Sequence, residues 1–409
     1  MSALSFVRAN ATWLGAGALM TASTGFGQTF FISLYADEWR AAFDLSHGDW
    51  GAIYMVATLA SAAVLTQAGR LADVVRARTL SLILFGVFAL VCVGVSFVSH
   101  WIMLAFLVFG LRFCGQGMLG HLAITSMGKW FRAGRARAVA VASLGFSIGE
   151  AILPAAAILV IAAFGWRASW LMAAAMLVLV VAPATFWLLR RERSPQSMAE
   201  SVVSPGMDGR HWTRGEMARH WMFWALLPGL IAPGWIGTTI FFQIRHLTEI
   251  KGWDVLAYAA LAYPAYSVVT IAASFAFGIA VDRFGAMRFL PVYLLGWAAG
   301  AILMGLAGPL WLGVVALGIS GVGSGGVSVV VIALTADLYG TRWLGGVKAI
   351  LTALMVLASA LGPGVSGALL DAGVGFEVQC LFMGGFLVAV SLWFAVVAAR
   401  GRTLIAAPT

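Results

Sequence analysis

The stretch Gly110-Leu-Arg-Phe-Cys-Gly-Gln-Gly-Met-Leu-Gly-His121 decides the fold, because it places an arginine inside an apolar run from about Ile102 to Met127. A run of that length crosses a hydrocarbon layer of about 30 Å, which takes about 20 helical residues. Arg112 lies near its middle, where burial of a guanidinium costs at least about 2.5–3.5 kcal/mol and the proton cannot be shed. The rest of the chain must therefore supply a partner or a water-filled cavity for this charge.

The composition indicates a protein with many membrane spans. The 409 residues are 62% hydrophobic and 10% charged, and the mean hydropathy is +0.96, whereas soluble domains carry roughly 25% charged residues. We expect no cleavable signal peptide, because the first apolar run continues into the first span. All three cysteines lie in apolar runs, and their spacing favours neither a disulfide framework nor a metal site. No cofactor is expected.

Apolar runs separated by charged, glycine or proline turns predict twelve transmembrane helices. The expected spans are 5–35, 50–70, 78–98, 102–127, 137–164, 168–189, 221–244, 256–281, 286–306, 310–338, 346–370 and 377–398. A polar, arginine-rich segment divides them six and six. We therefore expect an all-α membrane protein with two six-helix bundles related by a pseudo-twofold axis, 1–190 and 221–409, joined by a cytoplasmic linker at 191–220.

The positions of Lys and Arg predict the orientation. With the N-terminus inside, twenty of the 25 Lys and Arg residues fall in inside segments, four fall in outside loops, and Arg112 lies in mid-membrane. Cytoplasmic loops carry such an excess, so both termini are expected in the cytoplasm and the chain in the cell (inner) membrane. The same distribution accounts for the net charge of +9 without a nucleic-acid partner.

The two halves of the sequence repeat. Three features recur at offsets of 209 to 211 residues: Gly69 to Asp73 with Gly278 to Asp282, Pro154 with Pro363, and Phe30-Phe31 with Phe241-Phe242. A near-constant offset over half the chain indicates a duplicated six-helix unit, which is common in transporters. The glycine-rich run 318–326 has no strand before it and no Lys-Ser/Thr after it, so it predicts close helix packing rather than a nucleotide loop.

Over nearly its whole length the chain resembles the major facilitator superfamily. The loop signature after the second helix of each half is matched by Gly278, Asp282, Arg283 and Gly285 in the second half and by Gly69 and Asp73, with Arg76, in the first. Further matches are Arg112 with the glycines after it and Gly165-Trp166-Arg167. The resemblance implies alternating access. It also implies that Asp73, Arg76, Asp282 and Arg283 are gating residues, whose contacts hold the halves together in the outward-open state. The segment 43–50, with Arg112-x-x-Gly-Gln-Gly117, resembles the monocarboxylate and oxalate/formate branch, although the cationic residue that this branch often has in helix 8 is missing.

Arg112 and Glu150 are the strongest candidates for chemistry. They are expected at matching depth in neighbouring helices, each about 20 Å from the cytoplasmic side at 1.5 Å per residue, and pairing offsets the desolvation of both. Two interpretations stay open. Either Arg112 binds a carboxylate substrate while Glu150 takes up a proton, or the two form a permanent ion pair that locks the helices. At the 209 offset the second half has Gly321 and Ser359 instead.

The other candidates also have two interpretations each. His121 is either a proton relay or a packing residue. Gln28 and Gln116 bind the substrate or make hydrogen bonds between helices. In the second half, polar and aromatic residues line the substrate cavity or pack against neighbours and lipid: Phe241, Gln243, Tyr258, Tyr263 and Tyr266.

We therefore expect a monomeric secondary active transporter that moves a small, monocarboxylate-like organic anion with proton coupling, by symport or antiport. An exporter of a hydrophobic or cationic compound is the first alternative, and a non-transporting membrane receptor is the second. An enzyme is not expected, because the sequence presents no nucleophile–base constellation and no cluster of metal ligands.

Overall fold

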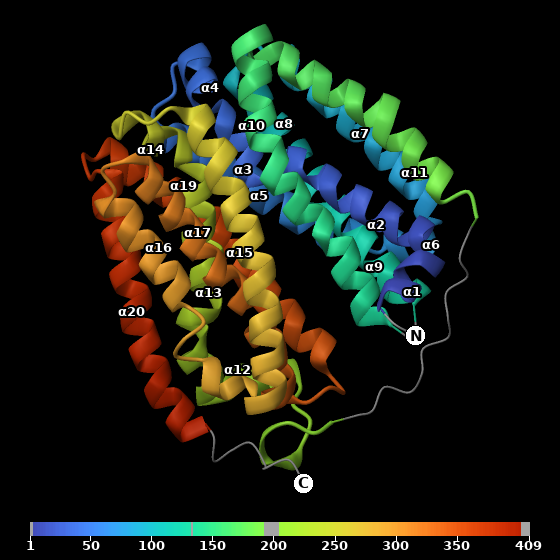
Figure 1. The fold of residues 1–409 in the computed structure, drawn as a ribbon, viewed down its shortest axis with the longest axis vertical. Helices are drawn as coiled ribbons and strands as arrows, with labels where there is room; N and C mark the ends of the chain where they lie inside the picture. The colour runs from blue at the N-terminus through green and yellow to red at the C-terminus, as the bar shows by residue number, and fades with distance from the viewer. Residues whose placement is uncertain (1–2, 132–133, 192–203, 402–409) are drawn as a thin grey trace. The chain divides into compact units, whose positions relative to one another are not determined.

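The structure, a computed structural model, describes residues 3–131, 134–191 and 204–401. The chain divides into two compact units, Met1–Ala199 (unit 1) and Glu200–Thr409 (unit 2), which Figure 1 draws in blue to green and in green to red. Every regular element in the described residues is helical. Residues 192–203, which belong to the predicted linker 191–220, lie outside the described residues.

In its described residues, unit 1 contains six spans built from eleven α-helices, two 3-10 turns and two π-helical stretches. In chain order they are α1 (Ala3–Ala9), α2 (Ala11–Ser23), η1 (Thr24–Gly27), α3 (Thr29–Ile32), η2 (Ser33–Tyr35), α4 (Ala36–Phe43), α5 (His47–Ala68), α6 (Leu71–Val74), α7 (Ala77–Ser96), α8 (Trp101–Leu111), η3 (Arg112–Leu119), α9 (Gly120–Trp130), α10 (Arg135–Met176), η4 (Leu177–Val181) and α11 (Ala182–Leu188). The prediction of one continuous first helix over 5–35 is wrong, because the chain leaves the helical conformation at Gln28.

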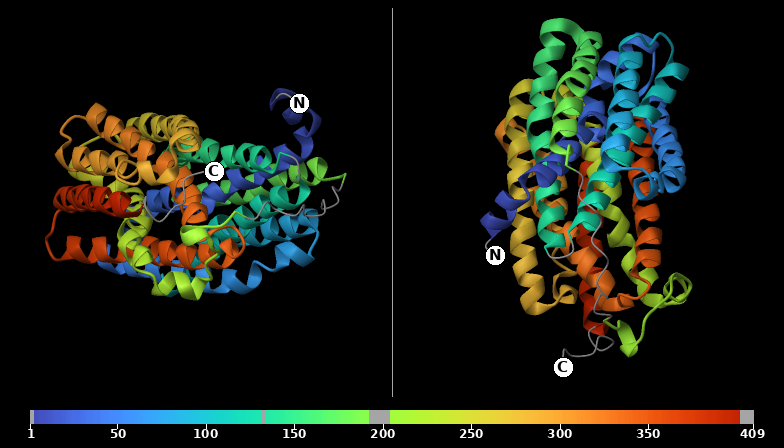
Figure 2. Two further views of the ribbon diagram at one scale, coloured as in Figure 1. Left: turned by 90° about the horizontal axis from the view of Figure 1, so that it is seen from below. Right: turned by 90° about the vertical axis from the view of Figure 1, so that its right-hand side faces the viewer.

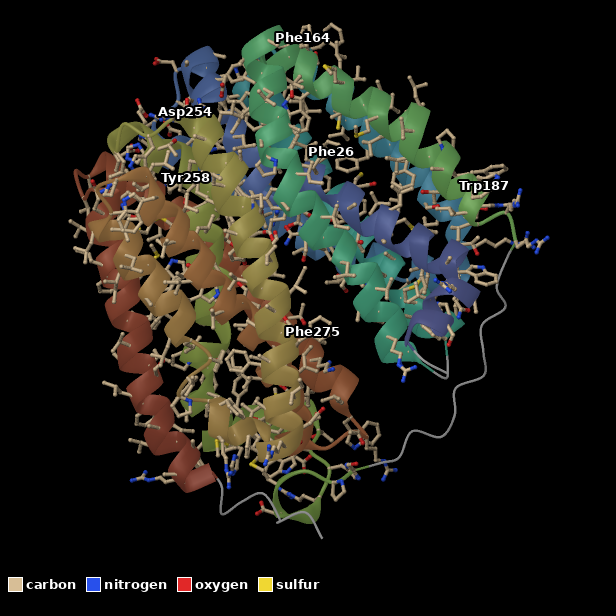
Figure 3. The ribbon with its side chains drawn as sticks, viewed as in Figure 1. Phe26, Phe164, Trp187, Asp254, Tyr258 and Phe275 are labelled. Carbon is tan, nitrogen blue, oxygen red and sulfur yellow. The ribbon has the colours of Figure 1, made fainter. Side chains whose placement is uncertain are left out.

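The predicted fifth and sixth spans meet at Gly165. Its backbone angles, φ 79° and ψ 161°, end one helix and start the next within α10, and glycine adopts this conformation without steric cost. Arg167 then donates hydrogen bonds to the carbonyl oxygens of Ser96 and Val98, at 2.7 and 3.0 Å, at the end of α7. Figure 3 shows Phe164 at this turn and Trp187 at the far end of the sixth span.

Unit 2 also contains six spans. Its elements are η5 (Met207–Gly209), α12 (Arg214–Arg219), α13 (Trp221–Phe242), α14 (Ile244–Ile250), α15 (Val255–Phe284), η6 (Ala286–Phe289), α16 (Leu295–Leu306), α17 (Leu310–Gly326), η7 (Val327–Val331), α18 (Ile332–Tyr339), α19 (Leu344–Asp371) and α20 (Phe376–Gly401). The predicted ninth span, 286–306, begins with a 3-10 turn and becomes α-helical only at Leu295. Pro291 lies between the two, where it cannot donate a helical hydrogen bond.

Together the units form an all-α membrane protein of twelve transmembrane helices in two bundles. Within the described chain, nine helices are long and apolar enough to cross a membrane. The number becomes twelve when the broken first span is added, the helix from 137 to 188 is divided at Gly165, and α16, 12 residues long, is joined to the turn before it. The prediction of twelve spans is confirmed.

The packing inside the units repeats as the sequence does. In unit 1, α2 packs on α10 and α5 on α8, and in unit 2 the equivalent helices α13 and α15 pack on α19 and α17. In each unit the long helices follow one common direction (Figure 2). The glycine-rich run packs closely, as predicted: a Cβ on Gly321 would lie 2.7 Å from the carbonyl oxygen of Tyr266, and one on Gly325 would lie 2.6 Å from the Cβ of Ala273.

Candidate functional site

The first span breaks in the middle of unit 1. The α-helix ends at Ser23, η1 follows, and Gln28 is extended at φ −85° and ψ 156° before helix resumes at Thr29. The amide of Gln28 still donates to the carbonyl of Gly25 at 3.0 Å. A break at membrane depth leaves backbone groups that need partners, and such breaks occur where the backbone is buried in protein or lines a cavity.

The fourth span approaches this break at backbone distance. Its helix is α-helical up to Leu111 and then widens into the π-helical stretch η3, which begins with Arg112. A Cβ on Gly115 would lie 2.7 Å from the Cα of Gly27, so only glycine fits between the two backbones. π-helical stretches often accompany functional sites, and this one sets the position of Arg112.

Arg112 fills the space beside the break. Its side chain is 2% exposed, and one terminal nitrogen (NH1) donates to the carbonyl oxygen of Gly27 at 3.3 Å and to Oγ1 of Thr29 at 3.4 Å. The guanidinium carbon lies 5.1 Å from the ring centre of Tyr54, whose hydroxyl is 2.6 Å from Oγ1 of Thr29. Within the described residues, Nε of Arg112 has no hydrogen-bond partner.

These contacts come from the first and second spans, and sequence reasoning did not foresee them. Thr29 and Tyr54 were missed because helical spacing says nothing about partners on other helices. The repeat carried a signal for one of them, however: at the offset of 209, Tyr54 corresponds to Tyr263. An aromatic residue kept at equivalent positions of both halves would have pointed to this cluster.

Glu150 lies half-buried in α10. The glycine before it packs on the first span, because a Cβ on Gly149 would lie 2.9 Å from the carbonyl oxygen of Ala22. The pairing of Glu150 with Arg112 stays a prediction.

The remaining polar candidates of unit 1 lie in different surroundings. Gln28 is half-buried at the break, between the two residues that Arg112 contacts. Gln116 and His121 are exposed. Nε2 of His121 lies 3.5 Å from the place of a Cβ on Gly69, near the predicted cytoplasmic end of α5. His121 is therefore closer to the predicted gate than to the break.

Three aromatic candidates of unit 2 form one cluster. The ring centre of Phe241 lies 5.8 Å from that of Tyr263 and 5.2 Å from that of Tyr266. Tyr266 extends the cluster to Trp297, at 6.2 Å, and its hydroxyl lies 2.6 Å from Oγ of Ser324. Trp297 and Ser324 are additions that the sequence did not indicate.

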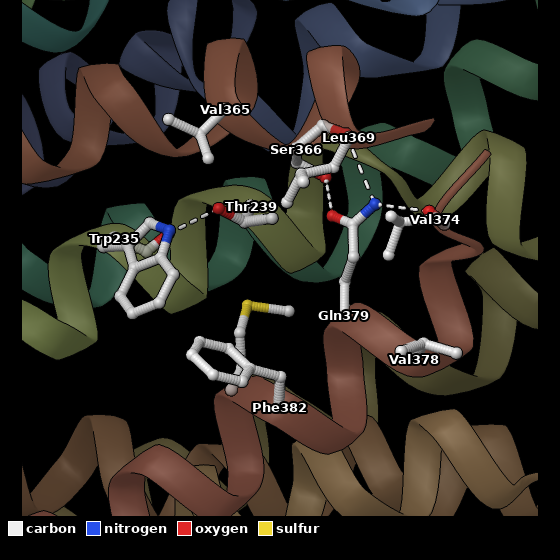
Figure 4. Close-up of a pocket in the computed structure, with 10 residues that line it drawn as sticks. Trp235, Thr239, Val365, Ser366, Leu369, Val374, Val378, Gln379 and Phe382 are labelled. Carbon is white, nitrogen blue, oxygen red and sulfur yellow. Dashed lines mark hydrogen bonds between the residues drawn. The ribbon is translucent and has the colours of Figure 1, made fainter. Parts of the chain in front are cut away.

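Two other candidates lie outside this cluster. Tyr258 stacks on Trp253 at 5.5 Å near Asp254, at one end of α15 (Figure 3). Gln243 is 3% exposed and donates to Oγ of Ser366 at 3.3 Å, and this hydroxyl donates to Oε1 of Gln379 at 2.6 Å. Nε2 of Gln379 donates to the carbonyl oxygens of Ser366 and Val374 (Figure 4). Gln243 thus joins a polar network that ties α13 to α19 and α20.

The gating candidates lie at the predicted cytoplasmic ends of both units. An oxygen of Asp73 is 2.6 Å from Nζ of Lys129, which also donates to the carbonyl oxygen of Ala72 at 2.9 Å. Lys129 was not among the predicted gating residues, because it lies 56 residues further along the chain. Arg76 precedes α7, and Asp282 and Arg283 are exposed at the end of α15, where the Arg283 guanidinium lies 5.1 Å from the ring centre of Phe284.

Comparison with known proteins adds the following findings. The family model described as Major Facilitator Superfamily matches residues 17–265 and 257–407. A relative from Thermoproteus tenax, named an uncharacterized 38 kDa protein in the 23S RNA operon, is 25% identical over 64% of this chain and 63% of its own length. The match therefore spans less than two thirds of that relative.

Solved structures share the fold over nearly the whole chain. A bacterial homologue of the human lysosomal transporter Spinster, inward-facing and unoccupied, gives a TM-score of 0.75 at 16% identity and covers 98% of this chain and 99% of its own. The nucleoside transporter NupG, in a mutant form, gives a TM-score of 0.71 at 13% identity and covers 95% and 99%. At these identities the likeness shows the fold alone.

Proposed function

The chain belongs to the major facilitator superfamily and is a secondary transporter of that family; we propose that its cargo is a small organic anion of the monocarboxylate kind, moved with protons by alternating access. The observation that carries the proposal is the state of Arg112. Its charge is buried, and within the described residues its contacts are a carbonyl, a hydroxyl and an aromatic ring, all uncharged. Such a cation favours an anion, and a carboxylate can bind a guanidinium through two parallel hydrogen bonds.

The first-span break supports access of an anion to this charge. Both hydrogen bonds of Arg112 are long, at 3.3 and 3.4 Å, and therefore weaker than the usual 2.7–3.2 Å bond. Both acceptors flank Gln28, the residue at which the helix stops. A small shift of this irregular segment exposes the guanidinium, because no continuous helical ladder has to be broken there.

The repeat supports a role for Glu150 beside the same site. In unit 2, Oγ1 of Thr238 lies 2.8 Å from Oγ of Ser359. At the offset of 209, Ser359 corresponds to Glu150 of unit 1. This pair supports the proposal that Glu150, whose neighbour Gly149 packs on the first span, belongs to the same site. We propose that Glu150 takes up the coupling proton when the anion engages Arg112.

We propose further that the ion pair between Asp73 and Lys129 belongs to the gate. It joins α6 to α9, the turn after the second span to the end of the fourth. A partly exposed ion pair contributes little to stability, which supports a role for this pair in holding the turn during transport. His121 near Gly69 adds a titratable group to the same region.

A second candidate function rests on the aromatic cluster of unit 2. Phe241, Tyr263, Tyr266 and Trp297 offer ring faces with hydroxyl groups at two points. Ring faces attract organic cations and pack on flat apolar compounds. Export of a hydrophobic or cationic compound is therefore the alternative that the same experiment must separate from anion transport.

The test is uptake into proteoliposomes with and without an inward proton gradient, over a panel of monocarboxylates, nucleosides and lipophilic cations. We expect gradient-dependent uptake of a monocarboxylate, its loss in Arg112→Gln, and normal uptake in Arg190→Gln. Arg190 is a matched control, because it is exposed and lies over the ring of Trp187 at 4.7 Å, away from the break. Uptake of a monocarboxylate that persists in Arg112→Gln contradicts the anion site, and extrusion of lipophilic cations alone supports the alternative.

A further inference from the structure

Each unit contains an apolar pocket at the same place in the repeat. The unit 1 pocket has a volume of about 140 Å³ and the unit 2 pocket about 340 Å³. Six lining positions correspond at an offset of 209 residues. They are Phe26, Ala156, Ala157, Val160, Ser169 and Ala173 in unit 1, and Trp235, Val365, Ser366, Leu369, Val378 and Phe382 in unit 2. The pocket is therefore a feature of the duplicated fold, and the larger copy belongs to unit 2.

The unit 2 pocket offers a ligand almost nothing but hydrocarbon. Its polar side chains are engaged with one another and with the backbone: Gln379 binds Ser366 and the carbonyl oxygen of Val374, and Thr239 donates to the carbonyl oxygen of Trp235 at 2.8 Å (Figure 4). With these bonds made, valine, leucine, phenylalanine and indole surfaces line the space. A polar ligand would lose its hydration there without gaining partners, whereas a hydrocarbon chain would not.

The mouth of the pocket lies at membrane depth. Val365 is 48%, Val378 59% and Phe382 65% exposed, although all three belong to membrane-spanning helices. Val365 and Phe382 each lie six residues from the nearer ends of α19 and α20, which corresponds to roughly 9 Å. At this depth a helix that crosses the membrane meets acyl chains, and the pocket is open to them.

We propose that the unit 2 pocket is a binding site for one unbranched alkyl chain of a membrane amphiphile, with the polar head beside the turn between α19 and α20. Its size agrees with this class of ligand, because an apolar cavity of roughly 150 Å³ holds one benzene ring. The unit 1 pocket is of that smaller volume, whereas the unit 2 pocket has more than twice the volume. The proposal is independent of the identity of the transported cargo.

Occupancy of the site has a structural consequence. The pocket is bordered by α13, α19 and α20, and the network from Gln243 through Ser366 to Gln379 joins the same three helices. Gln243 follows the helix that carries Phe241, a member of the aromatic cluster. A bound chain therefore supports the packing of the helix that positions this cluster.

The site is tested by photolabelling the whole protein in nanodiscs. Two probes carry a diazirine in the alkyl chain, one a free fatty acid and the other a phosphatidylcholine, and labelled peptides are mapped by mass spectrometry. We expect labelling concentrated around Val365, Val378 and Phe382, little at the unit 1 pocket, and competition by unlabelled palmitate. Labelling by the fatty acid identifies a free amphiphile as the source and labelling by phosphatidylcholine alone identifies a bilayer lipid; both support the site.

Two filling variants provide the specific test. In Val365→Trp and Val378→Trp the indole excludes about two methylene groups of the probe, so labelling of the pocket should fall about tenfold. Leu392→Trp is the matched control, because Leu392 is a 68% exposed residue of the same helix α20 outside the pocket. If Leu392 is labelled as strongly as Phe382, labelling follows exposure alone and the proposal is overturned. The proposal is also overturned if both filling variants keep the apparent unfolding temperature of the unmodified protein and are labelled to the same extent.

Discussion

Replacing Arg112 by methionine separates the two interpretations of this residue. The variant removes the charge and leaves an unbranched, apolar and shorter side chain in a site that is 2% exposed. The carbonyl oxygen of Gly27 then loses its partner, which costs about 1–3 kcal/mol, and the contact with the Tyr54 ring, worth up to about 2 kcal/mol, is lost as well. Thr29 keeps its bond to the Tyr54 hydroxyl at 2.6 Å.

Against these losses stands the relief of a buried charge. Desolvation of one ion costs several kcal/mol in a protein interior, and within the described residues no carboxylate bonded to Arg112 offsets it. The two sides nearly cancel, so the free energy of unfolding should change by less than about 2 kcal/mol. For a unit of this size that corresponds to a shift in the apparent unfolding temperature of less than about 8 °C, while anion uptake should disappear.

The assay is thermal unfolding in detergent at one fixed scan rate, together with uptake in proteoliposomes. Leu104→Met is the control for a methionine in the same span, because Leu104 is fully buried and the exchange conserves volume. A fall in the apparent unfolding temperature of more than about 15 °C would refute the reasoning, because it would mean that Arg112 mainly holds helices together. Preserved uptake with preserved stability would refute the anion role instead.

Three further predictions follow from particular contacts. Gly115→Val should abolish the folded state, because its Cβ would meet the backbone of the first-span break. Gly86→Val should be tolerated, because no atom of a neighbouring segment lies within 4 Å of its Cβ position. The yield of monodisperse protein from each variant measures the difference. Asp73→Lys and Lys129→Asp should each reduce transport, and the double exchange should restore part of it if their ion pair belongs to the gate; a cycle of uptake rates measures this. Burial lowers the pKa of His220 below its usual value of about 6.5, and the neutral Nδ1 accepts a hydrogen bond from the amide of the second residue of α13. This cap is therefore present above about pH 6.5 and is lost as the pH falls through the lowered pKa. On acidification the apparent unfolding temperature should fall less in His220→Asn than in the unmodified protein, and an equal fall would contradict the assignment.

The spans were predictable from the sequence, but the interruptions that create the site were not. Hydropathy reports where helix is apolar, so it identified the fourth span over 102–127, which the structure extends to Trp101–Trp130. It cannot report that the same span widens at Arg112 or that the first span stops at Gln28. Both irregularities lie where Gly27 and Gly115 approach each other, two residues that are 88 apart in the chain and meet only in the folded unit.

The partners of charged residues were unpredictable for a related reason. Depth along a helix follows from counting residues, which is why Arg112 and Glu150 were expected at one level. The direction in which a side chain leaves its helix depends on packing against other helices, and the contacts of Arg112 come from the first and second spans. Counting residues along a helix also could not identify Lys129 as the partner of Asp73, because the turn before α7 determines where that carboxylate lies.

The duplicated positions show how one scaffold serves two purposes. Tyr54 of unit 1 recurs as Tyr263, whereas Arg112 and Glu150 are replaced by Gly321 and Ser359. In unit 2 the glycine allows α17 to approach the carbonyl oxygen of Tyr266, and the serine bonds to Thr238. The same two positions therefore close the packing in unit 2. In unit 1 larger charged residues take these positions, and the fourth span is π-helical from Arg112 onward, whereas its equivalent in unit 2 is α-helical at Gly321 and becomes π-helical only at Val327. A charge introduced at Gly321 would have no such turn to accommodate it, which is a physical reason for the charged site to lie in unit 1 alone.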